Sequence, residues 1–486
     1  MTSAATSAGF LIALALIPGC TLGPDHQAPQ ISLPGAWSSP IAASTTLVQQ
    51  GAWWQRFQDS KLDGLVVTTL KANPDLAQAR ATLRAARASL VQQQAGSWPS
   101  VDASASVTRQ RSSSSAGSGG TGGASFDSSS GTASFDTGAT TSTTWEAGLN
   151  ASFELDVFGG QRRSVESSRA SAEASQADLD STVLSLISDV VEAYVQARGY
   201  QARLAVAQNT LATRRETAAL TRDRAKAGLA TELDAVQADA EVVNAEASIP
   251  PLEQSYQEQV HGLSVLTGAP PGDLLGSMEQ AEAIPSLAGQ IVADAPVTLL
   301  ARRPDIRAAE RRLAAATAAI GVAEADRYPA ISFAGMIGVN ASSLRDLGKI
   351  SDIVWSMAPE VSLPIFDAGR RTAIVEQRVA ERDEALAVWR STVLTALKEV
   401  ENALTGLDRE RAHNDVLRRS VAVYADAAHL ARAQYTAGLS DFFNFLESER
   451  SLAAAQDTLA QSDAAMAIQA VALFKALGGG WEAVPS

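Results

Sequence analysis

The chain has 486 residues, with 39 Lys and Arg against 53 Asp and Glu, so its formal net charge is −14. Only 19% of residues are charged and 5% are aromatic, whereas 46% are hydrophobic, which favours long, closely packed helices over an aromatic-rich globular core. The acidic balance without a Lys/Arg block argues against nucleic acid as a partner, and the widely spaced histidines give no metal-ligand spacing. Without a Ser/His/Asp arrangement or a phosphate-binding loop, the sequence argues against an enzyme and offers no catalytic residue.

The amino terminus combines an apolar run over residues 10–17 with the single cysteine, Cys20. The run is too short for a spanning helix, which needs about 20 residues, but it has the length of a signal-peptide core. The Ile-Pro-Gly-Cys sequence resembles a bacterial lipobox, so we predict a lipoprotein signal peptide over residues 1–19. A lipid such as palmitate is then expected on Cys20, with no other cofactor. The residues before the apolar run contain no Lys or Arg, which departs from the lipobox pattern, and a free thiol stays the alternative.

An internal repeat relates the two halves of the chain. Asn73-Pro74-Asp75-Leu76 recurs 230 residues later as Arg303-Pro304-Asp305-Ile306. Ala227-Gly228-Leu229 recurs 210 residues later as Ala437-Gly438-Leu439. The offset shrinks where the first half carries extra Ser- and Gly-rich sequence. We therefore predict two copies of one structural unit.

Each copy contains two segments in which apolar and polar residues alternate, namely residues 100–108 and 145–157, then 331–339 and 353–365. A period of two predicts strands with one apolar and one polar face. Although a soluble sandwich could alternate in this way, aromatic residues at the segment ends favour membrane strands. Four strands cannot close a barrel and open edges cannot lie in lipid, so the chain is expected to oligomerise. The Ser-, Gly- and Thr-rich sequence between the first two segments is expected to be a loop.

Long helical patterns follow the second strand of each copy. Residues 160–227 contain no Pro, and their apolar residues follow heptads, which predicts coiled-coil packing. About 65 residues at 1.5 Å each give a helix of roughly 100 Å. Each long helix is expected to end at Ala-Gly-Leu, where glycine adopts the left-handed conformation. Returning helices are expected over residues 231–266 and 441–476, and shorter helices, stacked end to end with them, over residues 60–97 and 305–328.

Four motifs in order resemble one family: Cys20-Thr21-Leu22-Gly23-Pro24-Asp25, Trp53-Trp54, Leu300-Ala301-Arg302-Arg303-Pro304-Asp305-Ile306 and Leu473-Phe474-Lys475-Ala476-Leu477-Gly478-Gly479-Gly480-Trp481. They resemble the outer membrane factor family, the TolC-like exit ducts of tripartite efflux pumps, in its lipid-anchored branch. The resemblance implies an α+β membrane protein that forms a homotrimer. Four strands per chain would close a twelve-stranded β-barrel in the outer membrane of a Gram-negative bacterium, continued by a coiled-coil tunnel in the periplasm.

The repeat and the resemblance together imply the domain boundaries. They are the signal peptide (1–19), a lipid-anchored and equatorial segment (20–60), the first repeat (61–267), an equatorial linker (268–303), the second repeat (304–476) and an equatorial tail (477–486).

The resemblance also implies functional residues near the inner end of the tunnel. Asp441 lies where this branch has an aperture aspartate, and Glu232 and Asp234 lie near the matching turn. Three copies of Asp441 would form a selectivity ring, held by arginines such as Arg432. The alternative is that these carboxylates only cap helix N-termini, where negative charge is favourable.

The turns themselves match the tip motif with which family members meet the periplasmic adaptor. The matching residues are Gly228 and Leu229 in the first copy and Gly438 and Leu439 in the second. A simple turn signal is the alternative, and both interpretations can hold.

The expected function is therefore passive conduction of drugs and other small toxic compounds out of the periplasm, gated at the helix tips. The implied partners are two further copies of the chain, an adaptor, an inner-membrane pump of the RND type and outer-membrane lipid. Two alternatives remain from the sequence: a type I secretion duct for polypeptides, and an envelope scaffold that transports nothing.

Overall fold

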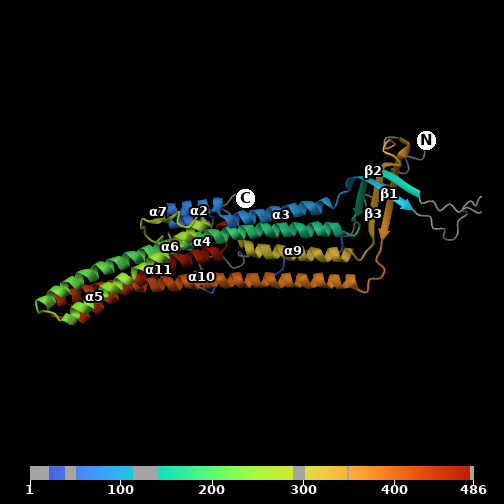
Figure 1. The fold of residues 1–486 in the computed structure, drawn as a ribbon. Helices are drawn as coiled ribbons and strands as arrows, with labels where there is room; N and C mark the ends of the chain where they lie inside the picture. Colours follow the sequence, from blue (N-terminus) through green and yellow to red (C-terminus); the bar gives the residue numbers. More distant parts are fainter. Residues whose placement is uncertain (1–20, 39–50, 113–139, 288–301, 347–349, 482–486) are drawn as a thin grey trace, which may run out of the picture. The chain divides into compact units, whose positions relative to one another are not determined.

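The computed structural model describes residues 21–38, 51–112, 140–287, 302–346 and 350–481. Cys20 and the predicted signal peptide lie outside the described residues, as do parts of the three equatorial segments. Figure 1 shows the helices and strands. In chain order they are η2 (Trp53–Phe57), α2 (Ser60–Ala72), α3 (Pro74–Ala95), β1 (Ser100–Ser112), β2 (Thr140–Leu155), α4 (Gly160–Lys226), α5 (Glu232–Ala247), α6 (Ile249–Leu266), α7 (Leu275–Met278), α9 (Pro304–Ala325), β3 (Ala330–Ala341), η4 (Ile350–Asp352), β4 (Ile353–Ser362), α10 (Arg370–Thr436) and α11 (Phe442–Ala476).

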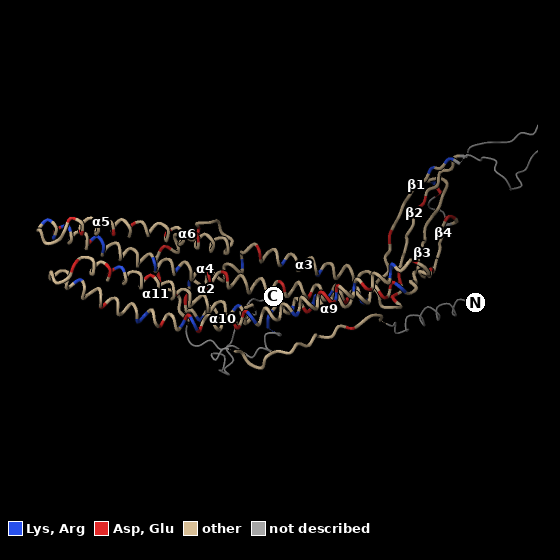
Figure 2. Tube along the Cα trace, turned by 90° about the horizontal axis from the view of Figure 1, so that it is seen from below, with Lys and Arg blue, Asp and Glu red and all other residues tan. Residues whose placement is uncertain are grey.

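The two longest helices, α4 and α10, have 67 residues each. They confirm the long helix expected in each repeat, and α11 confirms the returning helix expected over residues 441–476. Charged residues of both signs occur along these helices (Figure 2). Some form ion pairs between neighbours, as Arg203 of α4 does with Asp457 of α11 at 2.7 Å. Helices with an apolar seam flanked by such pairs are typical of coiled coils.

Two expected helices are interrupted by proline. The sequence predicts one helix over residues 60–97, but the chain forms α2 and α3, separated by Asn73 in an extended conformation with ψ 129°. The helix predicted over residues 231–266 is likewise divided into α5 and α6, with the proline pair 250–251 at the start of α6. Both predictions were wrong for the same reason. Proline has no backbone N–H to donate to the preceding turn, and at the first break it also favours the extended conformation of Asn73.

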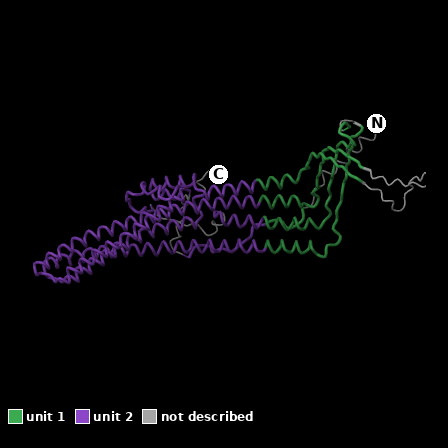
Figure 3. The backbone as a smooth tube through the Cα atoms, viewed as in Figure 1, with its two compact units in different colours: residues 1–26, 88–169, 315–382 green, residues 27–87, 170–314, 383–486 purple. Residues whose placement is uncertain are grey.

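The chain divides into two compact units (Figure 3). Unit 1 comprises residues 1–26, 88–169 and 315–382 and contains the four strands. Unit 2 comprises residues 27–87, 170–314 and 383–486 and contains the returning helices and both helical turns. Each unit therefore draws on both sequence repeats.

The four strands of unit 1 form one antiparallel sheet in the order β1-β2-β3-β4. The register pairs Val107 with Trp145, Leu149 with Ile337, and Ile337 with Trp355, so the apolar residues of all four strands share one face. This face is uncovered in the single chain: Trp355 is 75% exposed. An apolar sheet face of this extent needs an apolar neighbour.

The strand boundaries differ from the expected ones. β1 continues to Ser112 and β2 begins at Thr140, so the first hairpin is longer than the alternation predicts. β4 ends at Ser362, so Leu363 and Ile365 lie beyond it. Polar and basic residues at the far end of the first hairpin conceal its length, because they interrupt the apolar alternation without ending the strand pairing.

The helical joints of unit 2 repeat between the two copies. At the start of α3, the Asn73 amide donates to the carbonyl of Leu266, the last residue of α6, at 2.9 Å. At the start of α9, the Arg303 guanidinium donates to the carbonyl of Ala476, the last residue of α11, at 3.0 Å. Each short helix thus begins where a returning helix ends, which confirms the predicted end-to-end stacking.

Two of the sequence motifs contact each other in the largest core cluster of unit 2. Trp53 is 1% exposed and stacks on Phe474 with ring centroids 5.0 Å apart. Its indole N–H donates to the carbonyl of Gly479 at 3.1 Å. The Trp-Trp motif and the glycine-rich motif near the C-terminus therefore form one packed site, which explains why they occur together.

Candidate functional site

The two helical turns of unit 2 have the same backbone geometry. Gly228 and Gly438 adopt φ values of +72° and +74°. In both turns the N–H of the following leucine bonds to the carbonyl five residues earlier, at 2.8 Å. Left-handed glycines followed by such bonds end helices. The leucine side chains stay in solvent, Leu229 being 69% and Leu439 80% exposed, so each turn presents an apolar tip.

An arginine that the sequence analysis missed joins the two turns. Arg224, in the last turn of α4, donates to the carbonyls of Tyr435 at 2.7 Å and Thr436 at 3.1 Å, at the end of α10. Its guanidinium also lies 4.6 Å from the ring centroid of Tyr435, which in turn stacks on Phe445 of α11 at 5.2 Å. A cation at a helix carboxyl end and above an aromatic ring is favourable in both contacts. A favourable cation in the last turn of α4 could be predicted from the sequence, but the contacts of Arg224 with α10 could not.

The predicted aperture carboxylates lie next to the turns. Asp441 is the N-cap of α11, where its carboxylate accepts the backbone N–H of Asn444 at 2.9 Å. Glu232 is the first residue of α5, and Asp234 forms a capping box with Thr231. Asp441 and Asp234 therefore do take part in helix capping, and these contacts leave the aperture role open.

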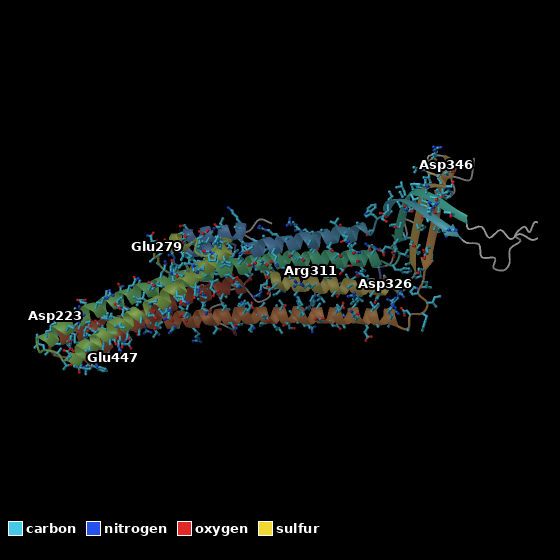
Figure 4. All side chains as sticks on the ribbon, viewed as in Figure 1. Asp223, Glu279, Arg311, Asp326, Asp346 and Glu447 are labelled. Carbon is cyan, nitrogen blue, oxygen red and sulfur yellow. The ribbon has the colours of Figure 1, made fainter. Side chains whose placement is uncertain are left out.

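Arg432 lies on α10, one helix before the N-cap Asp441 of α11. Within the described chain it forms an ion pair with Glu216 of α4, whereas the Asp441 carboxylate contacts the backbone of its own helix. Asp223 and Glu447 also lie at the turn end of unit 2 (Figure 4). The turn end of unit 2 is thus rich in carboxylates, and Arg224 and Arg432 there connect α4 with α10, helices of different repeats.

A buried ion pair lies between α4 and α11, farther from the helical turns. The Arg214 guanidinium of α4 lies 3.1 Å from the carboxylate of Glu449 on α11, and the two side chains are 4% and 9% exposed. The Thr217 hydroxyl lies 3.4 Å from the same carboxylate. Burial raises the pKa of Glu449, although the nearby charges of Arg214 and Arg432 lower it. Desolvation therefore outweighs pairing at this carboxylate.

The two faces of the sheet differ in charge as well as in polarity. All the acidic residues of the four strands lie on the polar face and are exposed: Asp102, Glu146, Glu154 and Glu360. Glu154 and Glu360 both pair with Ser332, one from each side, near the helix-proximal end of the sheet. Among the described residues, no helix combines the length and the apolarity needed to cross a bilayer. In the same part of the chain, His, Cys, Asp and Glu side chains form no group that could hold a metal.

Comparison with known proteins assigns this architecture. The family model for the outer membrane efflux protein matches residues 65–269 and 295–479. The chain belongs to the outer membrane efflux protein family. Nodulation protein T of Rhizobium leguminosarum bv. viciae is 36% identical over 98% of this chain and 94% of the relative. The pyoverdine export outer membrane protein OpmQ of Pseudomonas putida is 33% identical over 93% of both chains. The solved outer-membrane channel OprN is 34% identical, has a TM-score of 0.85, and matches over 95% of this chain and all of its own.

Family membership confirms the predicted fold class, location and general role. The chain is a non-enzymatic outer-membrane efflux channel, in which four strands and long helical hairpins per chain build a trimer with a periplasmic helical tunnel. It works as the outer-membrane component of a pump that includes an adaptor and an inner-membrane protein. The scaffold alternative is therefore wrong.

Proposed function

We propose that the channel conducts small molecules passively, prefers cations, is gated near the helical turns, and serves an RND-type pump. The observation that carries the cation preference is the sorting of the strand charges: every strand carboxylate lies on the polar face, opposite the apolar face. When three copies close a barrel with the apolar face toward lipid, these carboxylates line the water-filled passage and attract cations. The relative that exports pyoverdine supports a small-molecule cargo over a polypeptide.

Removing two of these carboxylates is expected to weaken cation selectivity. Glu154→Gln with Glu360→Gln takes six negative charges out of the trimer near one level of the passage, so the reversal potential under a KCl gradient should move toward zero. It is measured with the purified trimer in planar bilayers. Ser332→Ala, between the two positions, is the uncharged control and should leave the reversal potential unchanged. Unchanged selectivity in the double variant would contradict the proposed lining.

The proposed gate includes a ring of three Asp441 carboxylates near the channel axis. Two substitutions separate this role from helix capping, because Asn caps a helix as well as Asp does, whereas Ala does not. We expect Asp441→Asn to reduce cation block of the channel while thermal stability stays the same. Asp441→Ala should add a loss of about 1 kcal/mol in helix stability and a larger ion leak. Single-channel conductance in bilayers measures the cation block and the ion leak, and thermal unfolding measures the stability. Wild-type conductance in Asp441→Asn would assign the residue to capping alone.

We also propose that Cys20 carries a lipid. The segment that follows it is docked onto the start of α4 in unit 1: the buried Arg163 guanidinium donates to the carbonyls of Leu22 at 3.0 Å and Gly23 at 3.1 Å, and to the Asp25 carboxylate at 2.7 Å. The same junction carries the stacked pair Phe158 and Tyr328, with centroids 4.9 Å apart. Aromatic rings of this kind are enriched at membrane interfaces, within reach of an acyl chain.

Replacing the cysteine is expected to remove the lipid without removing the trimer. Cys20→Ala should abolish incorporation of labelled palmitate in cells. The trimer should still assemble, because one acyl chain contributes little beside a closed barrel. Palmitate labelling of the purified protein and its native mass give the two readouts. Undiminished labelling in Cys20→Ala would place the lipid elsewhere.

A further inference from the structure

The basic residues of the strands are sorted as strictly as the acidic ones. Arg109 and Arg111 of β1 continue the odd-numbered series that begins with Val101 and includes Val107, so they lie on the apolar face of the sheet. The strands β1 to β4 contain no other Lys or Arg. The Lys/Arg colour appears on β1 at its end away from the helices (Figure 2). The lipid-facing surface is therefore apolar along most of its length and positive at one end.

The two arginines lie just beyond the apolar band. On β2 the outward residues from Trp145 to Leu155 span about 34 Å along the strand, or roughly 25 Å along the membrane normal at the usual tilt, which is the height of a barrel's apolar band. Val107 pairs with Trp145 at the outer limit of this band. Arg109 follows about 5 Å and Arg111 about 10 Å farther out. Lipid headgroups begin at this depth.

We propose that Arg109 and Arg111 bind phosphate groups of the phosphorylated glycolipid of the outer leaflet, the lipid A part of lipopolysaccharide. Both side chains are exposed, and the strand carboxylates lie on the opposite face. Arginine suits this position because its aliphatic stem lies on apolar surface while its guanidinium forms paired hydrogen bonds with phosphate. The proposal extends the outer-membrane location and does not depend on the gate or the cargo.

Charge complementarity singles out this patch. The chain has a net charge of −14, so most of it repels an anionic lipid. The other described charges at this end of unit 1 are Glu146, on the opposite face of the sheet, and Arg345, Asp346 and Asp352, on the connection between β3 and β4. Asp346 accepts a hydrogen bond from Ser343 at 2.6 Å and is labelled in Figure 4. Within one chain, two strands separate this connection from β1.

The test uses the purified, delipidated trimer in a neutral detergent, titrated with bisphosphorylated lipid A and followed by native mass spectrometry. We expect one or more lipid A molecules per chain to bind the wild type. The double variant Arg109→Gln and Arg111→Gln should bind at least tenfold more weakly. Arg109→Lys with Arg111→Lys should retain part of the affinity, since lysine keeps the charge but loses the paired geometry. Arg84→Gln, at an exposed arginine of α3, is the matched control and should bind like the wild type.

Three results would overturn the proposal. Equal binding of lipid A by the wild type and the double glutamine variant would remove the arginines from the contact. Equal binding of dephosphorylated lipid A would remove the phosphate. Arginine-dependent binding of phosphatidylglycerol as tight as that of lipid A would assign the pair to phospholipid in general. The native mass of each variant shows whether the trimer is intact, so a folding defect is separated from a loss of binding.

Discussion

Replacing Leu229 by Arg is expected to abolish efflux while the trimer still forms. Leu229 is 69% exposed at the first helical turn, and open space surrounds the adjacent Gly228. A cation is also favourable at the carboxyl end of α4, so the substitution does not disturb the fold. In the assembled pump this leucine is proposed to enter an apolar contact with the adaptor. A charge buried there without a partner costs several kcal/mol, which is a loss of more than a hundredfold in affinity at each tip.

Efflux is measured as the extrusion of a fluorescent cationic dye from cells that express the channel with its own pump and adaptor. Leu229→Met, which keeps an apolar side chain of similar size, is the matched control and should retain full efflux. Native electrophoresis gives the oligomeric state. Loss of the trimer in Leu229→Arg would show a purely structural turn, and normal efflux with an intact trimer would show that the adaptor does not use this tip.

Removing Arg214 is expected to cause the largest loss of stability. Arg214→Met leaves the 9% exposed carboxylate of Glu449 without its partner 3.1 Å away. Breaking a buried pair from one side costs about 3–5 kcal/mol. The neighbouring Arg215 provides a matched control, because its pair with Glu246 is 60% and 49% exposed and such surface pairs contribute 0 to about 1 kcal/mol. Thermal unfolding of the purified trimer at pH 7 compares Arg214→Met with Arg215→Met.

The pH dependence of that loss follows from the pKa of Glu449. Burial raises this pKa in the folded protein, and removing Arg214 raises it further. The stability linked to this carboxyl is therefore complete below its ordinary pKa and is lost as the pH rises through the raised value. Arg214→Met should be most destabilised at pH 7 and recover toward about pH 4, whereas Glu449→Leu added to Arg214→Met should recover at every pH. A destabilisation that does not change with pH would contradict this explanation.

Periodicity predicted the parts of the fold that depend on local pattern. The four alternating segments form four strands with one apolar and one polar face, as predicted, because the apolar side of a half-buried strand fixes its register. The breaks at Pro74 and at the 250–251 proline pair were missed, because the apolar pattern continues through both. The Arg432 pairing with Glu216 was missed for a different reason: which side chains meet across two helices depends on their relative register, and one sequence does not contain it.

Each chain contains two kinds of long helical segment, which differ in how they can bend: continuous helices, and helices stacked end to end at a joint. α4 and α10 are continuous, so bending them strains an unbroken ladder of backbone hydrogen bonds. α6 with α3, and α11 with α9, meet instead at interfaces that include the Asn73 and Arg303 contacts with helix carboxyl ends. A rotation at these joints breaks no backbone hydrogen bond within a helix. When the tunnel widens at its inner end, we therefore expect the jointed helices to rotate while the continuous helices α4 and α10 keep their positions.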